Sequence, residues 1–81
     1  MKIRVQLFAQ ARALAGTGEL ELELPAGAVI ADARRALAQQ APELAGLLQR
    51  SRIALADDFT DNDVSLTEGA HIAVIPPVSG G

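Results

Sequence analysis

Two segments near the start of the chain alternate between apolar and polar residues, and this alternation limits the possible folds more than any other feature. In residues 2–8 (KIRVQLF), Ile3, Val5 and Leu7 share one phase. In residues 19–24 (ELELEL), three leucines alternate with three glutamates. A period of two is typical of a strand that buries one face, so both segments are predicted to be strands of a sheet with one covered side.

The middle of the chain changes to helical spacing. Residues 29–41 are predicted to form the main helix, which would turn one face to the sheet: Val29, Ala33, Ala36, Leu37 and Gln40. Pro42 lacks a backbone N–H and should end this helix. Residues 9–16 (AQARALAG) and 43–49 (ELAGLLQ) are predicted to be short helical pieces. Arg12 and the Arg34-Arg35 pair could contact an acidic partner, but we interpret them as ordinary solvent-exposed charges.

The second half of the chain offers two more strands. They are residues 52–56 (RIALA) and 71–75 (HIAVI), and the acidic run 57–63 (DDFTDND) between them is interpreted as a hairpin turn. One helix laid across a small mixed sheet, with the first and last strands adjacent and parallel, buries all the apolar faces. The predicted fold is therefore α+β: a β-grasp, ubiquitin-like domain over residues 1–75, followed by a protruding tail, residues 76–81.

Composition excludes several functions. The 81 residues suffice for one small domain, and the absence of cysteine excludes disulfides and thiolate chemistry. A net charge of −3 without a basic run argues against nucleic-acid binding. No apolar stretch reaches the roughly 20 residues of a membrane span, and the alternating start is unlike a signal peptide, so we expect a cytoplasmic location. His71 is the lone histidine, and no metal site is expected.

The tail, PPVSGG, suggests a chemical role for the end of the chain. Pro76 and Pro77 favour a semi-rigid extended spacer, and Gly80 and Gly81 remove every side chain near the terminal carboxylate. Such a slender arm could enter a slot in another protein. A carboxylate is a poor electrophile, but transfer to ATP as an acyl-adenylate would activate it toward a nucleophile. The alternative is a frayed terminus without function.

Two stretches resemble a known family. Residues 66–81 (LTEGAHIAVIPPVSGG) and residues 5–17 (VQLFAQARALAGT) are similar to the C-terminal and N-terminal signatures of the small, sulfur-carrying subunits of molybdopterin synthase, the MoaD/ThiS-like relatives of ubiquitin. The resemblance implies that an E1-like adenylyltransferase uses ATP to adenylate Gly81. Sulfur from a persulfide donor would then convert the carboxylate into a thiocarboxylate. No bound cofactor is implied.

The same resemblance implies how the sulfur is used. The tail residues Pro76, Pro77, Val78, Ser79 and Gly80 would insert into the large subunit, and the thiocarboxylate of Gly81 would donate sulfur to cyclic pyranopterin monophosphate to form molybdopterin. The complex would be a heterotetramer of two small and two large subunits. The small subunit is thus part of an enzyme, a sulfurtransferase, although most catalytic side chains are expected in the large subunit.

Two apolar residues outside the predicted core phase suggest a docking surface. Phe8 falls on the polar phase of the first strand, and Ile75 lies on the phase of His71 and Ala73. We hypothesise that Phe8 and Ile75 form an apolar docking patch at the root of the tail; the alternative is a second core face covered by loops or by the short helix. Other functions remain open: a sulfur carrier for thiamine or tRNA thiolation, a ubiquitin-like protein modifier, or an interaction module with an inert tail.

Overall fold

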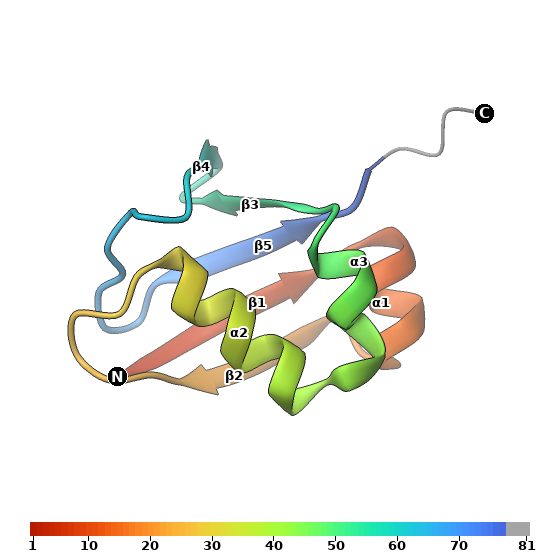
Figure 1. Cartoon of the computed structure of the whole chain (residues 1–81), viewed down its shortest axis with the longest axis horizontal. Helices are drawn as coiled ribbons and strands as arrows, with labels where there is room; N and C mark the ends of the chain where they lie inside the picture. Colours follow the sequence, from red (N-terminus) through yellow and green to blue (C-terminus); the bar gives the residue numbers. More distant parts are fainter. Residues whose placement is uncertain (78–81) are drawn as a thin grey trace.

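The structure is a computed structural model and describes residues 1–77 (Figure 1). In this part of the chain the elements follow in the order β1 (Lys2–Leu7), α1 (Ala9–Ala15), β2 (Glu19–Glu23), α2 (Ile30–Gln40), the 3-10 helix η1 (Pro42–Leu44), α3 (Ala45–Leu48), β3 (Arg52–Leu55), β4 (Asp58–Thr60) and β5 (His71–Ile75). Figure 1 shows α2 and α3 lying across one face of the sheet.

The five strands form one mixed sheet in the order β2-β1-β5-β3-β4. β1 and β5 are parallel neighbours, and every other pair is antiparallel. The prediction of a β-grasp sheet with its first and last strands side by side is therefore confirmed.

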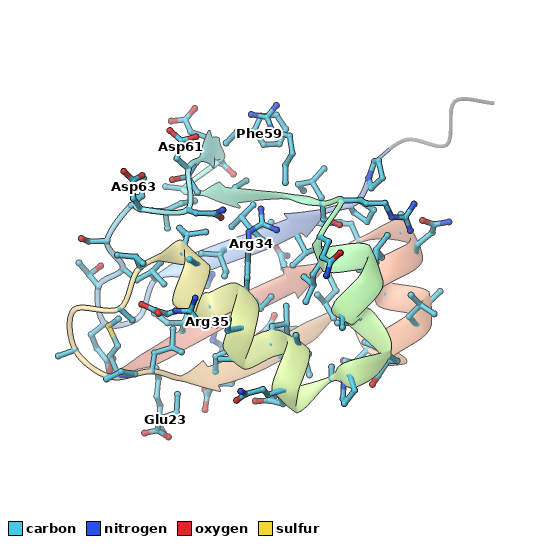
Figure 2. The ribbon with its side chains drawn as sticks, viewed as in Figure 1. Glu23, Arg34, Arg35, Phe59, Asp61 and Asp63 are labelled. Carbon is cyan, nitrogen blue, oxygen red and sulfur yellow. The ribbon has the colours of Figure 1, made fainter. Side chains whose placement is uncertain are left out.

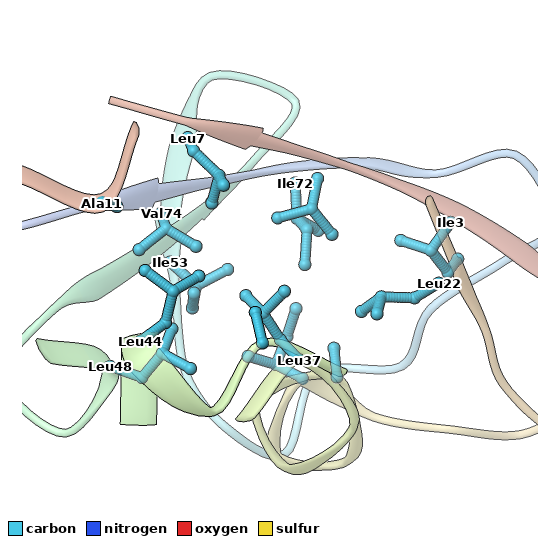
Figure 3. Close-up of a cluster of buried hydrophobic side chains, with 14 of the residues drawn as sticks. Ile3, Leu7, Ala11, Leu22, Leu37, Leu44, Leu48, Ile53, Ile72 and Val74 are labelled. Carbon is cyan, nitrogen blue, oxygen red and sulfur yellow. The ribbon is translucent and has the colours of Figure 1, made fainter. Parts of the chain in front are cut away.

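The core lies between the sheet and α2 and is made of aliphatic side chains (Figure 3). The alternation in β1 and β5 turns one phase inward, so that Ile3, Val5 and Val74 have no exposed surface. α2 contributes Ile30 and Leu37 to the same cluster. Burying side chains of this size contributes about 1.5–3 kcal/mol each, which makes this layer the main source of stability.

The main helix is one residue shorter at each end than predicted. Val29 is its N-cap, and the Asp32 carboxylate accepts a hydrogen bond from the Val29 N–H at 2.8 Å. Gln40, which was predicted to face the sheet with the apolar residues, is exposed, and its side-chain amide donates to the carbonyl of Glu21. Pro42 ends α2 as predicted and starts η1, where the N-terminal turn of a helix tolerates its missing N–H.

The prediction of a turn over residues 57–63 is wrong. The chain turns at Ala56 and Asp57, whose φ angles are 51° and 71°, and residues 58–60 form β4 against β3. A two-residue hairpin loop with positive φ at both positions usually contains glycine or asparagine. Because the sequence here is Ala-Asp, the usual signal of a tight hairpin is missing.

The interpretation of Arg34 as a surface charge is also wrong. Its guanidinium donates hydrogen bonds to the carbonyls of Leu48 (2.6 Å) and Ser51 (2.9 Å) and to Asn62 Oδ1 (2.8 Å). Desolvation by burial lowers the pKa of Arg34 from its usual value. Arg34 thus connects α2 to the end of α3 and to the loop after β4. Its neighbour Arg35 is exposed and, within residues 1–77, forms an ion pair with Asp32 alone.

Candidate functional site

The candidate site surrounds the point where the tail leaves the sheet. β5 ends at Ile75; Pro76 is half-buried and Pro77 is exposed. Because β1 and β5 run parallel, the chain leaves the sheet at the end where β1 also finishes, as Figure 1 shows. The remaining predicted tail residues lie outside the described part of the chain: Val78, Ser79, Gly80 and Gly81.

Phe8 lies at this end of the sheet, between β1 and α1. Its backbone is extended (φ −123°, ψ 157°), so it continues the phase of Arg4 and Gln6 on the face away from α2. The chain then turns sharply into α1 through Ala9, whose φ is 49°. The Phe8 side chain remains 44% exposed, unlike its buried neighbour Leu7.

Ile75 lies beside Phe8 on the same face. The parallel register pairs Arg4 with His71 and Gln6 with Ala73, and one further step brings Phe8 level with Ile75. Ile75 is half-buried. The structure therefore places both predicted docking residues together at the root of the tail; that they bind a partner stays a prediction.

A third apolar residue on this face, Phe59, was not predicted from the sequence. It lies opposite Ala54, which in turn lies opposite Ala73, so these residues extend the surface across β5, β3 and β4. The Phe59 ring is 53% exposed, and the Arg52 guanidinium stacks over it at 3.8 Å from the centroid. Figure 2 shows Phe59 at the β4 edge of the molecule. We call the following residues the open-face patch: Phe8, Ala54, Phe59, Ala73 and Ile75.

The open-face patch has the features of a docking surface. Aromatic side chains and arginine are enriched at protein interfaces, and a cation stacked on a ring presents a flat, partly apolar area. A shallow depression adjoins it, with Gln6, Asp57 and His71 among its lining residues. His71 is exposed and lies opposite Arg4. The polar side chains around the patch can supply hydrogen bonds at the rim of an interface.

Residues 1–77 contain no cluster of three or more His, Asp or Glu side chains placed to hold a metal ion. Over the same residues, no helix combines the length and the apolarity that crossing a membrane requires.

Curated relatives match the whole chain. A molybdopterin synthase sulfur carrier subunit from Arabidopsis thaliana is 32% identical over 81 residues, an alignment that spans all of this chain and 84% of the relative. The subunit of the same name from Chlamydomonas reinhardtii is also 32% identical, with full coverage of both chains.

Solved structures share the fold. SAMP1 from Haloferax volcanii superimposes with a TM-score of 0.91 over all of both chains, at 22% identity. A chain from the complex of subunits 1 and 2 of molybdopterin-converting factor from Helicobacter pylori has a TM-score of 0.72 and 26% identity, again with full coverage of both. The ThiS family model matches residues 5–81, which include the second half of β1, all of β5 and the tail residues. The chain therefore belongs to the ThiS family.

Proposed function

We propose that this protein is the sulfur-carrying small subunit of molybdopterin synthase and that Gly81 is the residue that carries the sulfur. The observation that supports this most directly is the extent of the similarity. The family match continues through residue 81, and the curated sulfur carrier subunits align with the whole chain. The matched region thus includes Gly80 and Gly81.

The described geometry fits this role. The tail leaves the sheet at Pro76, next to Ile75 and at the end of the sheet where Phe8 lies. A partner that binds the open-face patch could therefore also bind the tail. Six extended residues span at most about 20 Å, enough to bring Gly81 into a slot of that partner. The matched Helicobacter pylori structure is a complex of two subunits. We propose that a large subunit covers the open-face patch here, in a heterotetramer of two small and two large subunits.

The proposed chemistry takes place at the Gly81 carboxylate. An E1-like partner transfers the carboxylate to the α-phosphorus of ATP, and pyrophosphate leaves. The terminal sulfur of a persulfide donor then attacks the acyl carbon and expels AMP, and reduction of the resulting acyl disulfide by a thiol frees the thiocarboxylate. The thiocarboxylate supplies sulfur to cyclic pyranopterin monophosphate, and hydrolysis restores the carboxylate; two loaded carriers are needed for one dithiolene. ATP is consumed by the activating partner, in the cytoplasm.

The direct test is the intact mass of the protein after incubation with an E1-like adenylyltransferase, ATP and a persulfide donor. We expect the mass increase that corresponds to one oxygen replaced by sulfur. A variant without Gly81 should fold equally well and stay unmodified, because a protruding terminus adds little to the core. The loaded protein, mixed with large subunit and cyclic pyranopterin monophosphate, should form molybdopterin and return to its original mass.

Other outcomes would identify the alternatives. Isopeptide-linked targets would show a ubiquitin-like modifier, and a loaded terminus that serves only thiamine or tRNA thiolation would assign another sulfur pathway. Sulfur transfer by the variant without Gly81 at the normal rate would refute the proposed mechanism.

A further inference from the structure

Among the described residues, the edge strand β2 has a neighbouring strand on one side only. β2 is the first strand of the sheet, and its partner in residues 1–77 is β1. The Leu24 N–H donates to the Met1 carbonyl (2.8 Å), and the Leu7 N–H donates to the Gly18 carbonyl (2.9 Å). Antiparallel pairing alternates, so the even-numbered residues of this segment bond to β1. The odd-numbered residues project their N–H and C=O groups away from the sheet: Glu19, Glu21 and Glu23.

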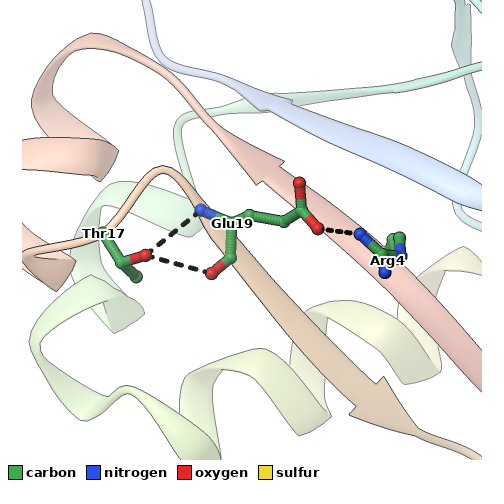
Figure 4. Close-up of polar contacts among 3 residues, drawn as sticks. All are labelled: Arg4, Thr17 and Glu19. Atoms are coloured by element: carbon green, nitrogen blue, oxygen red, sulfur yellow. Dashed lines mark hydrogen bonds and ion pairs between the residues drawn. The ribbon is translucent and has the colours of Figure 1, made fainter.

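Side chains occupy part of this outer edge. Thr17 Oγ1 accepts a hydrogen bond from the Glu19 N–H (3.4 Å) and donates to the Glu19 carbonyl (3.2 Å), as Figure 4 shows. Gln40 Nε2 donates to the Glu21 carbonyl at 3.2 Å. All three bonds are exposed and long, so a competing strand could displace them at small cost. Within residues 1–77 the Glu21 N–H and both backbone groups of Glu23 take part in no hydrogen bond.

The charges along β2 determine which kind of partner strand could pair with its outer edge. The side chains of Glu19, Glu21 and Glu23 are exposed on the face away from α2. Arg4 pairs with Glu19 (Figure 4), whereas Glu21 and Glu23 form no ion pair within the described residues. Figure 2 shows Glu23 pointing away from the body of the molecule. Antiparallel pairing with a second copy about Glu21 would set glutamate opposite glutamate, which is unfavourable. A strand with basic side chains on this face would be favoured.

The opposite side of the same edge is mixed in character. Leu20 is half-buried there, and a groove between the end of β2 and α2 is lined by apolar residues such as Ala26 and Ala36 together with the polar side chains of Asp32, Arg35 and Gln39. Side chains of an added strand alternate between the two faces. One set would therefore meet the glutamates, and the other would contact Leu20 and the apolar part of this groove.

We propose that the outer edge of β2 is a docking site for an extended segment of a partner protein in which basic residues alternate with small apolar residues. The segment would add a sixth strand to the sheet, and its backbone would bond to Glu21 and Glu23. This site goes beyond the proposed sulfur transfer, because it uses neither the tail nor any residue of the open-face patch.

The test uses the full chain and a capped synthetic peptide in which lysine and valine alternate. We expect saturable binding by NMR titration and slower hydrogen exchange at the Glu21 and Glu23 amides, while the Leu20 and Leu22 amides, already bonded to β1, change little. A peptide with the same composition but with lysines and valines in separate blocks should bind at least about tenfold more weakly, because it cannot match the alternating faces. Unchanged exchange at Glu21 and Glu23 would overturn the proposal.

Two variants separate strand addition from simple charge attraction. Glu21→Lys with Glu23→Lys should weaken peptide binding by about tenfold or more, whereas the control Asp61→Lys with Asp63→Lys, which makes the same charge change on exposed residues after β4, should have a much smaller effect. Glu21→Pro removes an outward N–H without removing a bond to β1 and should also abolish binding. Equal losses in the two lysine pairs would mean that only net charge attracts the peptide and would refute the site.

Discussion

The two faces of the sheet are formed by the same strands, yet they differ sharply in burial. On the face toward α2, Ile3, Val5 and Val74 have no exposed surface. On the other face, Phe8 and Phe59 are 44% and 53% exposed. Neighbouring residues of one strand therefore belong to different surfaces. Residues of one phase form the core and stabilise the fold, whereas residues of the other phase are available to partners. Substitutions on the covered face should therefore change the free energy of unfolding, and substitutions on the open face should change the affinity for a partner.

The largest effect is expected on the covered face. Leu37→Ala removes a buried side chain from the centre of α2 and should lower the free energy of unfolding by about 2–5 kcal/mol. Leu14→Ala is the matched control, because Leu14 is 51% exposed on α1, and it should change stability by less than about 1 kcal/mol. Urea unfolding followed by circular dichroism measures both. Similar losses in the two variants would contradict the division between the faces.

The second effect concerns binding on the open face. Phe8→Asp places a charge in the open-face patch and should weaken association with the large subunit by about 2 kcal/mol or more, since exposed aromatic anchors dominate many interfaces. Its free energy of unfolding should change little. Gln10→Asp introduces the same charge at an exposed position of α1 outside the patch and serves as the control. Calorimetric titration with the large subunit gives the affinities, and unchanged affinity for Phe8→Asp would remove the patch from the proposed interface.

The third prediction concerns the hydrogen bonds by which Arg34 of α2 holds the end of α3. Arg34→Met removes three hydrogen bonds and leaves the Leu48 and Ser51 carbonyls without this donor, so stability should fall by about 1–3 kcal/mol. Arg35→Met removes only an exposed ion pair and should cost at most about 0.5 kcal/mol. Thermal unfolding of the two variants compares adjacent arginines directly. If Arg35→Met lowers the stability more than Arg34→Met does, the role given to Arg34 is wrong.

The smallest effect concerns the turn that carries Phe59 to the open face. Ala56 and Asp57 both have positive φ, so replacing them by Asn and Gly should stabilise the protein by about 0.5–1 kcal/mol. Ala54→Gly, in the adjoining strand β3, should instead destabilise it. Denaturation midpoints of the two variants provide the comparison. A loss of stability in the turn variant would show that the side chain of Ala56 or Asp57 has a role that its backbone conformation does not reveal.

Sequence periodicity predicted those parts of the fold that depend on local pattern. The alternation in β1, β2 and β5 and the proline after α2 were sufficient, because each signal lies within a few residues of the element it defines. β4 and Phe59 were missed because Ala56 and Asp57 form a tight turn without the residues that usually mark one. The role of Arg34 could not be predicted, since its acceptors lie on segments brought together only by folding.

The candidate site was predicted in part by the same reasoning. Phe8 and Ile75 were predicted because each is an apolar residue on the phase of its strand that does not face the core. The parallel register of β1 and β5 places them at the same end of the sheet. That Phe8 and Ile75 bind a large subunit stays a prediction. The four residues from Val78 to Gly81 lie beyond the described part of the chain, so the tail chemistry depends on family similarity and on the chemistry of a carboxylate.

The pairing of β1 with β5 also sets the order of events during synthesis. Lys2–Leu7 are made before the other strands of the sheet, whereas their parallel partner, His71–Ile75, is made after them. Contacts between segments so distant in sequence form late in folding, since the loop between them must first be closed. A nascent chain therefore cannot complete the centre of its sheet before residue 75 has emerged.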